Sequence, residues 1–414
     1  MSAVPSEALH QNSGNVTLRF NANNTREQPL TAALNLLFEK ATMEGAADIH
    51  LESREDQSIV ARMRNKDGDL VQVHEFSSDE ANLVFNKIRN RANLSTSDTR
   101  GAQDSRIAQE AGGRILSVRV SVVKTLHGYS CVMRLLDPNN SGRPIASLMM
   151  PERVEKSFRS VINSPEGLIL TVGPTGSGKT STLYTAINLL NDPSIKICTA
   201  EDPVEYVLPG IQQVEVGANR GISFAEALRS FLRQDPDIIL VGEVRDGETI
   251  STALAAGQTG HLVLSTLHAN DSIEAMERMI ELGAKPQTLR SALRAVIAQR
   301  LVRTVCEHCK EEREIVDAES IDILQRAEMQ TRLEIVGKGC DHCAGKGYSG
   351  RRAIYEMLLM DKPARLAVSR VDIEALRQAA HHQRQFRTLL RSGLQLVEDG
   401  VTNMKEIRRV VVEL

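Results

Sequence analysis

The stretch GPTGSGKT, residues 173–180, follows the apolar run GLILTV and precedes residues 182–190, whose apolar positions recur at helical spacing. A strand, a glycine-rich turn and a helix in this order form a phosphate-binding loop, and the G-x-x-x-x-G-K-[ST] pattern is matched at every fixed position. The glycines let successive backbone N–H groups point inward at an anion, and the helix N-terminus adds partial positive charge. A chance glycine-rich turn is the alternative, and both flanking elements count against it.

This loop predicts an ATP site with a magnesium ion. Lys179 would reach the β- and γ-phosphates, and the Thr180 hydroxyl would bind Mg²⁺. The expected nucleotide-binding residues are Gly173, Pro174, Thr175, Gly176, Ser177, Gly178, Lys179, Thr180 and Ser181.

Composition narrows the class of protein. The 414 residues suggest two or three domains, and 41% hydrophobic with 25% charged residues is ordinary for a globular chain. A formal net charge of −3 argues against binding nucleic acid through bulk basicity. The sequence has no run of about 18 apolar residues, and its first residues lack the basic and apolar parts of a secretory signal. We expect a cytoplasmic protein.

The chain divides into four segments by pattern. Residues 1–27 are rich in Asn, Ser, Thr and Gln and predict a flexible arm. Residues 28–136 predict an α+β domain, 137–150 a Pro/Gly/Asn-rich linker, and 151–414 an α/β domain. In the first domain we expect helices at 29–45 and 78–92 and strands at 47–52, 58–64, 71–76, 114–123 and 130–136.

Strands and helices alternate after the linker, which predicts a mainly parallel sheet. The expected strands are 167–172, 195–200, 237–242 and 261–267, apolar runs typical of strands covered on both faces. The polar clusters that follow them are GPTGSGKT, EDPVE (201–205), EVRD (243–246) and HAND (268–271). Because the carboxyl ends of parallel strands share one edge, where ligands bind, we expect these clusters to converge around one nucleotide.

Acidic residues at this edge are candidates for the chemistry. DIILVGE has the form of a Walker B strand that delivers an acid, Glu243, to the Mg²⁺ shell. EDPVE supplies three carboxylates, and hydrolysis needs one to orient or deprotonate water and another to hold metal-bound waters. Either run by itself fits a solvated acidic turn equally well, but the shared sheet edge favours a site.

Two histidines, His261 and His268, bracket the last of these strands. They lie seven residues apart, so period-two alternation points them to opposite faces. At most one is expected to touch the phosphate directly, and a structural role is the alternative for both.

Four segments resemble the Walker A, Asp box, Walker B and His box of the secretion ATPases, the GspE/PulE/PilB type that drives type II secretion and type IV pilus assembly. They are GPTGSGKTSTLY, TAEDPVEY, LRQDPDIILVGEVRD and TGHLVLSTLHAND. With further segments on either side, the similarity covers residues 29–411. It implies a PAS-like α+β domain followed by a RecA-like P-loop ATPase domain. QDSRI, residues 103–107, departs from the family's commoner QDGRI in what we expect to be a turn.

The resemblance implies roles for four residues of the α/β domain. Glu205 would be the catalytic acid that positions the lytic water, and Glu243 would hold Mg²⁺ through water. His261 and His268 would sense the γ-phosphate.

Arg119 and Arg134 match arginines that the family's N-terminal domain brings to the nucleotide. There they would neutralise charge that develops on the transferred phosphoryl group. The alternative is two solvent-facing strand positions. Arg229 and Arg233, in the helix before DPDIILVG, are further candidates.

Four of the six cysteines form two C-x-x-C pairs, which are Cys306, Cys309, Cys340 and Cys343. In a reducing compartment this spacing favours a metal over disulfides, and four thiolates suit a closed structural zinc site. The alternative is four unligated thiols. We expect a zinc knuckle within residues 300–350 and C-terminal helices over 361–414.

The sequence therefore predicts a Mg²⁺-dependent ATPase motor. The resemblance implies a homohexamer, peripheral to the inner membrane, that acts through a membrane platform protein on pilin or pseudopilin subunits. A pilus-retraction motor and a nucleic-acid translocase of the same superfamily are the alternatives. The cysteines count against the first, and the acidic balance, which predicts no direct nucleic-acid partner, counts against the second.

Overall fold

The computed structural model describes residues 27–65, 68–97, 101–136, 144–217 and 220–411. They form two compact units, which divide between Pro138 and Asn139. The predicted arm lies outside the described residues except for Glu27, and so do residues 137–143 of the predicted linker. Within the described ranges, no helix combines the length and the apolarity that crossing a bilayer requires.

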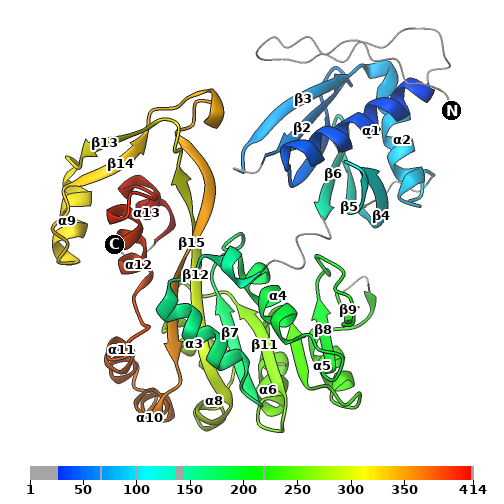
Figure 1. Cartoon of the computed structure of the whole chain (residues 1–414). Coiled ribbons are helices and arrows are strands. Elements are labelled where there is room, and N and C mark those ends of the chain that lie inside the picture. Colours follow the sequence, from blue (N-terminus) through cyan, green and yellow to red (C-terminus); the bar gives the residue numbers. More distant parts are fainter. Residues whose placement is uncertain (1–26, 66–67, 98–100, 137–143, 218–219, 412–414) are drawn as a thin grey trace. The chain divides into compact units, whose positions relative to one another are not determined.

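The first unit is a six-stranded antiparallel sheet in the order β3-β2-β1-β6-β5-β4, with two helices beside it (Figure 1). Its core joins one face of the sheet to both helices, and along β5 the buried residues Leu116, Val118 and Val120 alternate with outward-facing ones. The elements are α1 (Glu27–Glu44), β1 (Asp48–Ser53), β2 (Ile59–Arg64), β3 (Leu70–Phe76), α2 (Ser78–Arg91), β4 (Gln103–Ala111), β5 (Arg114–Thr125) and β6 (Gly128–Leu136).

Strand β4 is the element of this unit that the sequence analysis missed. It includes residues 103–107, which were expected to form a turn, so that expectation was wrong. Its sequence, QDSRIAQEA, is polar and has no regular apolar alternation. As an edge strand, β4 pairs with β5 along its whole length and needs few buried side chains.

The second unit contains a seven-stranded sheet in the order β15-β12-β7-β11-β10-β8-β9, parallel except where β15 joins β12. The strands are β7 (Gly167–Val172), β8 (Ile197–Glu201), β9 (Gln212–Glu215), β10 (Ile238–Val241), β11 (Leu262–Leu267), β12 (Leu293–Val305) and β15 (Tyr348–Leu359). The prediction of a mainly parallel sheet is confirmed, and its expected strands are β7, β8, β10 and β11.

Helices cover both faces of this sheet, which gives two separate cores. One core includes α3 and α4, and the other includes helices from α5 to α13. The helices are η2 (Ile145–Leu148), α3 (Glu152–Ile162), α4 (Lys179–Leu190), α5 (Phe224–Phe231), α6 (Gly247–Ala256), α7 (Glu274–Glu281), α8 (Pro286–Ala292), α10 (Lys362–Arg370), α11 (Ile373–His381), α12 (Leu389–Glu398) and α13 (Met404–Val410).

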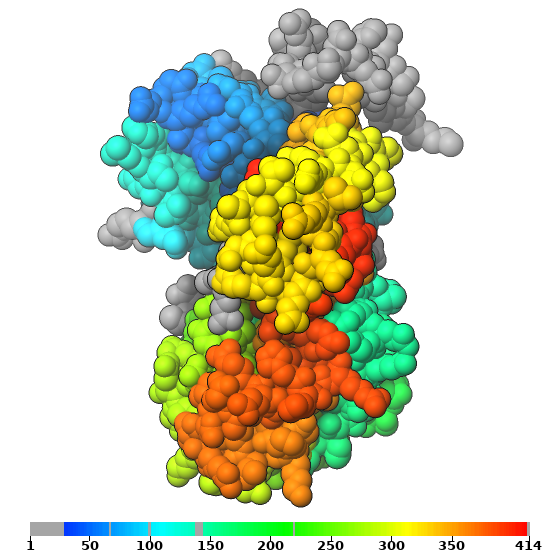
Figure 2. Space-filling model, turned by 90° about the vertical axis from the view of Figure 1, so that its left-hand side faces the viewer, coloured from blue at the N-terminus to red at the C-terminus, as the bar shows by residue number. Residues whose placement is uncertain are grey.

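Strands β12 and β15 extend beyond the sheet toward a small module that carries the four cysteines (Figure 1). The module consists of β13 (Lys310–Glu314), α9 (Ala318–Arg326), β14 (Leu333–Gly337) and η4 (Asp341–Cys343), with β13 and β14 antiparallel. Figure 2 shows this yellow segment beside the red C-terminal helices. Arg408 of α13 makes ion pairs with Asp317 and Glu319 at the start of α9, which joins the two parts.

Glu406 of α13 is a fully buried carboxylate that fastens α13 to β12. It accepts hydrogen bonds from the backbone and guanidinium of Arg303 and from Arg409. Burial alone would raise the pKa of Glu406, but these hydrogen bonds outweigh it and lower the pKa to about 2. Because the folded pKa lies below the unfolded value, the charged group stabilises the fold above pH ~4.5 and loses this effect as pH falls toward 2.

We expect Glu406→Gln to lower the free energy of unfolding at pH 7 by about 3 kcal/mol, since the pKa difference corresponds to this amount. At pH 3.5 the difference from the unsubstituted protein should be smaller by about 1 kcal/mol, because the glutamate is then protonated in the unfolded chain while Glu406 is still charged in the folded protein. Denaturant unfolding at the two pH values measures it, with the exposed Glu398→Gln as control. A difference that does not vary with pH would contradict this account.

Candidate functional site

The phosphate loop connects β7 to α4 and packs closely against β12. Gly173 has φ +149°, and a Cβ at this position would lie 2.6 Å from the Gln299 carbonyl and 3.1 Å from Nη1 of Arg300. A side chain would therefore push the loop off β12. Gly178, at φ +90°, is the N-cap of α4, so the helix begins at Lys179 with its amides toward the loop.

The loop carries polar groups suited to an anion. Ser177 is 3% exposed, and its Oγ has no hydrogen-bond partner among the described residues. Lys179 Nζ donates to the carbonyls of Gly173 and Pro174, at 2.8 and 3.0 Å. Burial lowers the pKa of Lys179, partly offset by Glu243. An orphaned hydroxyl, a half-buried lysine and a helix N-terminus together fit a nucleotide phosphate.

Gln299 of β12 holds the phosphate loop through hydrogen bonds, a role that the sequence did not predict. Its Nε2 donates to the Ser177 carbonyl at 2.7 Å, and its Oε1 accepts from Thr182 of α4 at 2.8 Å. Gln299 is 1% exposed, so both bonds are shielded from water. The signal was a polar residue within the apolar run RAVIAQRLV, but its partners lie more than a hundred residues earlier.

The structure places Glu243 and His268 at the same edge as the loop. Glu243 follows β10 and His268 follows β11, and Glu243 Oε2 lies 3.7 Å from His268 Nε2. Glu243 also pairs with Arg245, which in turn lies 3.5 Å from Asp202. Charged contacts thus link EVRD to HAND and to EDPVE. Lys179 of the phosphate loop lies near enough to Glu243 for their charges to interact.

The three carboxylates of EDPVE have different environments. Glu201 is buried, accepting from Thr199 at 2.5 Å, from Gln213 at 3.1 Å and from the Tyr184 hydroxyl. Burial raises the pKa of Glu201, which has a structural role. Tyr184 of α4 also accepts from the amide of Glu205 at 3.3 Å, which holds this turn against the phosphate-loop helix.

Glu205 itself is half-buried, and among the described residues its carboxylate has no ion-pair partner. Of the three acids in the turn, it is the one free to contact water or a ligand. The contacts of Tyr184 were not foreseen, because a tyrosine within an apolar helix gives no sign of its partner.

His261 lies at the opposite end of β11 from His268. It comes before Leu262, the first residue of β11, and its Nδ1 lies 3.2 Å from the carbonyl of Ala256. Strands rise about 3.3 Å per residue, so the Cα atoms of the two histidines are about 23 Å apart. The structure therefore does not bring His261 to the phosphate edge of its own chain, which corrects the expectation of a histidine pair there.

Arg119 and Arg134 face each other on adjacent strands of the first unit, in a row of charge across the sheet. The antiparallel register pairs Arg106 with Arg119, Arg119 with Arg134, Arg134 with Asp48 and Asp48 with Arg64. Directly opposed residues share one face, and here it is the face away from the core. Arg134 pairs with Asp48 at 2.8 Å, whereas Arg119 has no ion pair among the described residues.

Like charges directly opposite one another destabilise a sheet. This arginine row, with one aspartate among four arginines, is therefore suited to an anionic partner. In the other unit, Arg229 of α5 pairs with Glu248, and Arg233 donates to Ser230 Oγ at 3.3 Å.

The four predicted metal ligands converge, with their sulfur atoms all within 4.8 Å of one another. The separations are 3.9 Å for Cys306–Cys340 and 3.8 Å for Cys309–Cys343 and Cys340–Cys343. Four sulfurs at about 2.3 Å from a tetrahedral ion lie about 3.8 Å apart, so the cluster could bind zinc without rearrangement. The amides of Gly339 and Gly347 donate to Cys309 and Cys343 and would stabilise thiolates.

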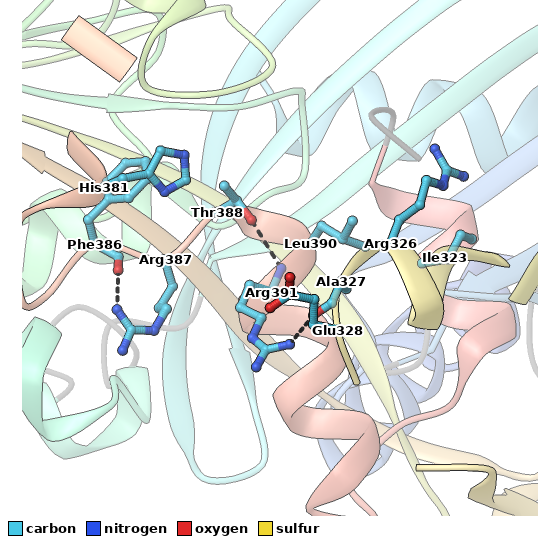
Figure 3. Close-up of a pocket in the computed structure, with 10 residues that line it drawn as sticks. All are labelled: Ile323, Arg326, Ala327, Glu328, His381, Phe386, Arg387, Thr388, Leu390 and Arg391. Atoms are coloured by element: carbon cyan, nitrogen blue, oxygen red, sulfur yellow. Dashed lines mark hydrogen bonds between the residues drawn. The ribbon is translucent and has the colours of Figure 1, made fainter. Parts of the chain in front are cut away.

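A separate hollow lies between α9 and the start of α12, with a volume of about 520 Å³. Figure 3 shows its lining, in which the Arg326, Arg387 and Arg391 side chains point in different directions. These arginines do not converge on one point, unlike the groups around the phosphate loop.

Comparison with known proteins agrees with this geometry. Residues 23–409 match the family described as "Type II/IV secretion system protein". The type II secretion system ATPase E of Vibrio cholerae is 39% identical over 389 residues, which cover 94% of this chain and 76% of that protein. The type IV pilus assembly ATPase PilB of Thermus thermophilus is 38% identical over 380 residues, 90% of this chain and 42% of that protein.

Solved structures agree on the fold. The pilus retraction motor PilT with bound ADP superposes with a TM-score of 0.65 at 25% identity, covering 90% of this chain and 95% of that chain. The ATPase DotB of Legionella pneumophila superposes with a TM-score of 0.70 at 20% identity, covering 95% and 98%, which shows a shared fold. The chain therefore belongs to the type II/IV secretion system protein family, as its four nucleotide-site motifs indicated.

Proposed function

We propose that this protein is a Mg²⁺-dependent ATPase that powers assembly of a type II secretion pseudopilus or a type IV pilus. The observation that carries the proposal is the meeting of Lys179, Glu243 and His268 at one sheet edge. Glu205, in the turn after β8, has no ion pair among the described residues. The names of two relatives, a type II secretion system ATPase and a type IV pilus assembly ATPase, support a role in assembly.

Each residue of the edge would have a distinct part in hydrolysis. The loop amides and Lys179 would bind the β- and γ-phosphates, and Thr180 and Glu243 would hold Mg²⁺, which supplies charge neutralisation when bound. Glu205 would orient the attacking water or take its proton. His268, 3.7 Å from Glu243, would respond to the γ-phosphate. Arg245 would be released from Glu243 when the metal shell forms.

The arginine row of the first unit would supply charge from outside this edge. In a ring of six identical chains, Arg119 or Arg134 would reach a bound nucleotide and stabilise the charge that develops on its γ-phosphate. An uncompensated arginine on an exposed sheet face supports this role. Rotation of one unit against the other would then couple hydrolysis to movement.

The work would be transmitted to a platform protein in the inner membrane, and through it to pilin or pseudopilin subunits. The chain would act from the cytoplasmic side. The cysteine module favours a role in pilus or pseudopilus assembly over pilus retraction, because the retraction motors among the secretion ATPases generally lack such a module. The net charge of −3 favours a protein partner over direct contact with nucleic acid.

Glu205→Gln should lower kcat for ATP at least about 100-fold, because a general base contributes about 10² to 10⁴ in rate. ATP affinity should stay within about threefold, since the phosphate loop is unchanged. Steady-state phosphate release and titration with a fluorescent nucleotide measure the two quantities. The surface variant Glu155→Gln is the control, and near-normal turnover of Glu205→Gln would exclude the assigned role.

Metal analysis of the purified protein should find about one zinc ion per chain, bound by the four cysteines. Cys340→Ser should lose the zinc and lower the thermal midpoint, because the module then lacks its central cross-link. Cys198→Ser, which alters a buried thiol outside the cluster, should keep the zinc. A metal-free protein that unfolds at the same temperature with and without a chelator would refute the site.

A further inference from the structure

Glu356 of β15 is a buried carboxylate that none of the nucleotide motifs contains. It is 3% exposed and joins two segments that are distant in sequence. Its Oε1 accepts from the Ser272 amide at 2.8 Å and the Ser272 hydroxyl at 2.5 Å, and its Oε2 accepts from the Leu389 amide at 3.1 Å. A carboxylate fully engaged in a dry environment holds its partners firmly.

One of these segments is the loop that carries His268. Ser272 comes four residues after His268 and is fully buried. Asp271 Oδ1 accepts from the amides of Ile273 and Glu274 at 2.7 Å, which starts α7. The loop between the phosphate edge and α7 is thus fixed at its far end by Glu356.

The same loop contacts a buried arginine behind the phosphate loop. Arg300 is 4% exposed and donates to the Asn270 carbonyl at 2.8 Å and the Gln299 carbonyl at 3.1 Å. Its guanidinium lies against Gly173, as the close approach of Nη1 shows. Arg300 therefore spans the space between the loop after β11 and the first residue of the phosphate loop.

The charge of Arg300 has no direct counter-ion. Among the described residues, no carboxylate lies within 4.0 Å of it. Burial lowers the pKa of Arg300, while Glu356, Glu274 and Asp271 raise it through longer-range attraction. A buried cation depends on such charges. Neutralising Glu356 would therefore disturb Arg300, and with it the backbone contacts on both sides.

The other segment held by Glu356 is the start of α12. Leu389 is its first residue, and the N-cap Thr388 accepts from the Arg391 amide at 3.2 Å. Thr388 and Leu390 line the hollow between α9 and α12 (Figure 3). One side chain thus ties the phosphate edge to the helices that border the cysteine module.

We propose that Glu356 is a positioning residue for nucleotide turnover, which acts through Ser272 and Arg300 on the loop of His268 and on the phosphate loop. The inference rests on the proposed ATPase function. It adds a link between the nucleotide and α12, through which movement of the C-terminal helices would change the site.

Glu356→Gln tests it, because the amide loses the charge and cannot accept from both Ser272 and Leu389 at full strength. We expect kcat for ATP to fall at least about tenfold, with ADP affinity within about threefold. Glu406→Gln is the matched control, since it neutralises another buried, fully hydrogen-bonded glutamate of the same unit. Its kcat should remain within about twofold despite its lower stability.

A second measurement distinguishes failure of this inference from failure of the proposed function. It is the ratio of the affinities for ATPγS, a slowly hydrolysed ATP analogue, and for ADP, which can be measured without turnover. Absent turnover in the unsubstituted protein would contradict the proposed function. The ratio should still shift at least about fivefold in Glu356→Gln and remain unchanged in Glu406→Gln.

Ser272→Ala loses the hydroxyl hydrogen bond to Glu356 but keeps the hydrogen bond from the backbone amide. It should shift the affinity ratio in the same direction, and it replaces Glu356→Gln as the test variant if Glu356→Gln does not fold. The inference would be overturned if Glu356→Gln had the same ATPγS-to-ADP affinity ratio and the same turnover as Glu406→Gln. If Glu356→Gln does not fold, an unchanged affinity ratio in Ser272→Ala would overturn it instead.

Discussion

The contact between the phosphate loop and β12 is the constraint on which the nucleotide edge depends. Gly173 passes so close to the Gln299 carbonyl that no side chain fits, and Gln299 holds Ser177 and Thr182 in turn. The loop amides are therefore held in place by a neighbouring strand before any ligand arrives. Preorganised donors of this kind lower the reorganisation that phosphate binding and hydrolysis require.

The same strand connects the site to the rest of the unit. β12 carries Gln299 and Arg300 at the loop and Arg303 at the far end, where Glu406 fastens α13. β15, its antiparallel partner, carries Glu356. Between them, the two strands run from the phosphate edge to the cysteine module and contact the C-terminal helices α12 and α13.

Much of the fold could be predicted because its signals are local. β7, β8, β10 and β11 are short apolar runs followed by polar turns. This pattern is typical of strands in a sheet that is covered on both faces. The two C-x-x-C pairs likewise predicted a cluster that the structure forms. β4 and β12 were missed for different reasons. β4 is an edge strand with little apolar alternation, and β12 (Leu293–Val305) is a long strand whose last six residues lie in the region 300–350 that was interpreted as a metal module.

By itself, the sequence determined that a phosphate loop, a Walker B acid and four cysteines are present, because each depends on residue types at fixed short spacing. Only the tertiary structure decided which polar residues share the edge. It placed His268 there and His261 at the far end of β11, made Glu201 structural while leaving Glu205 unpaired, and brought Glu356 to Ser272. The physical reason is that these roles depend on partners distant in sequence, which strand order and burial bring together.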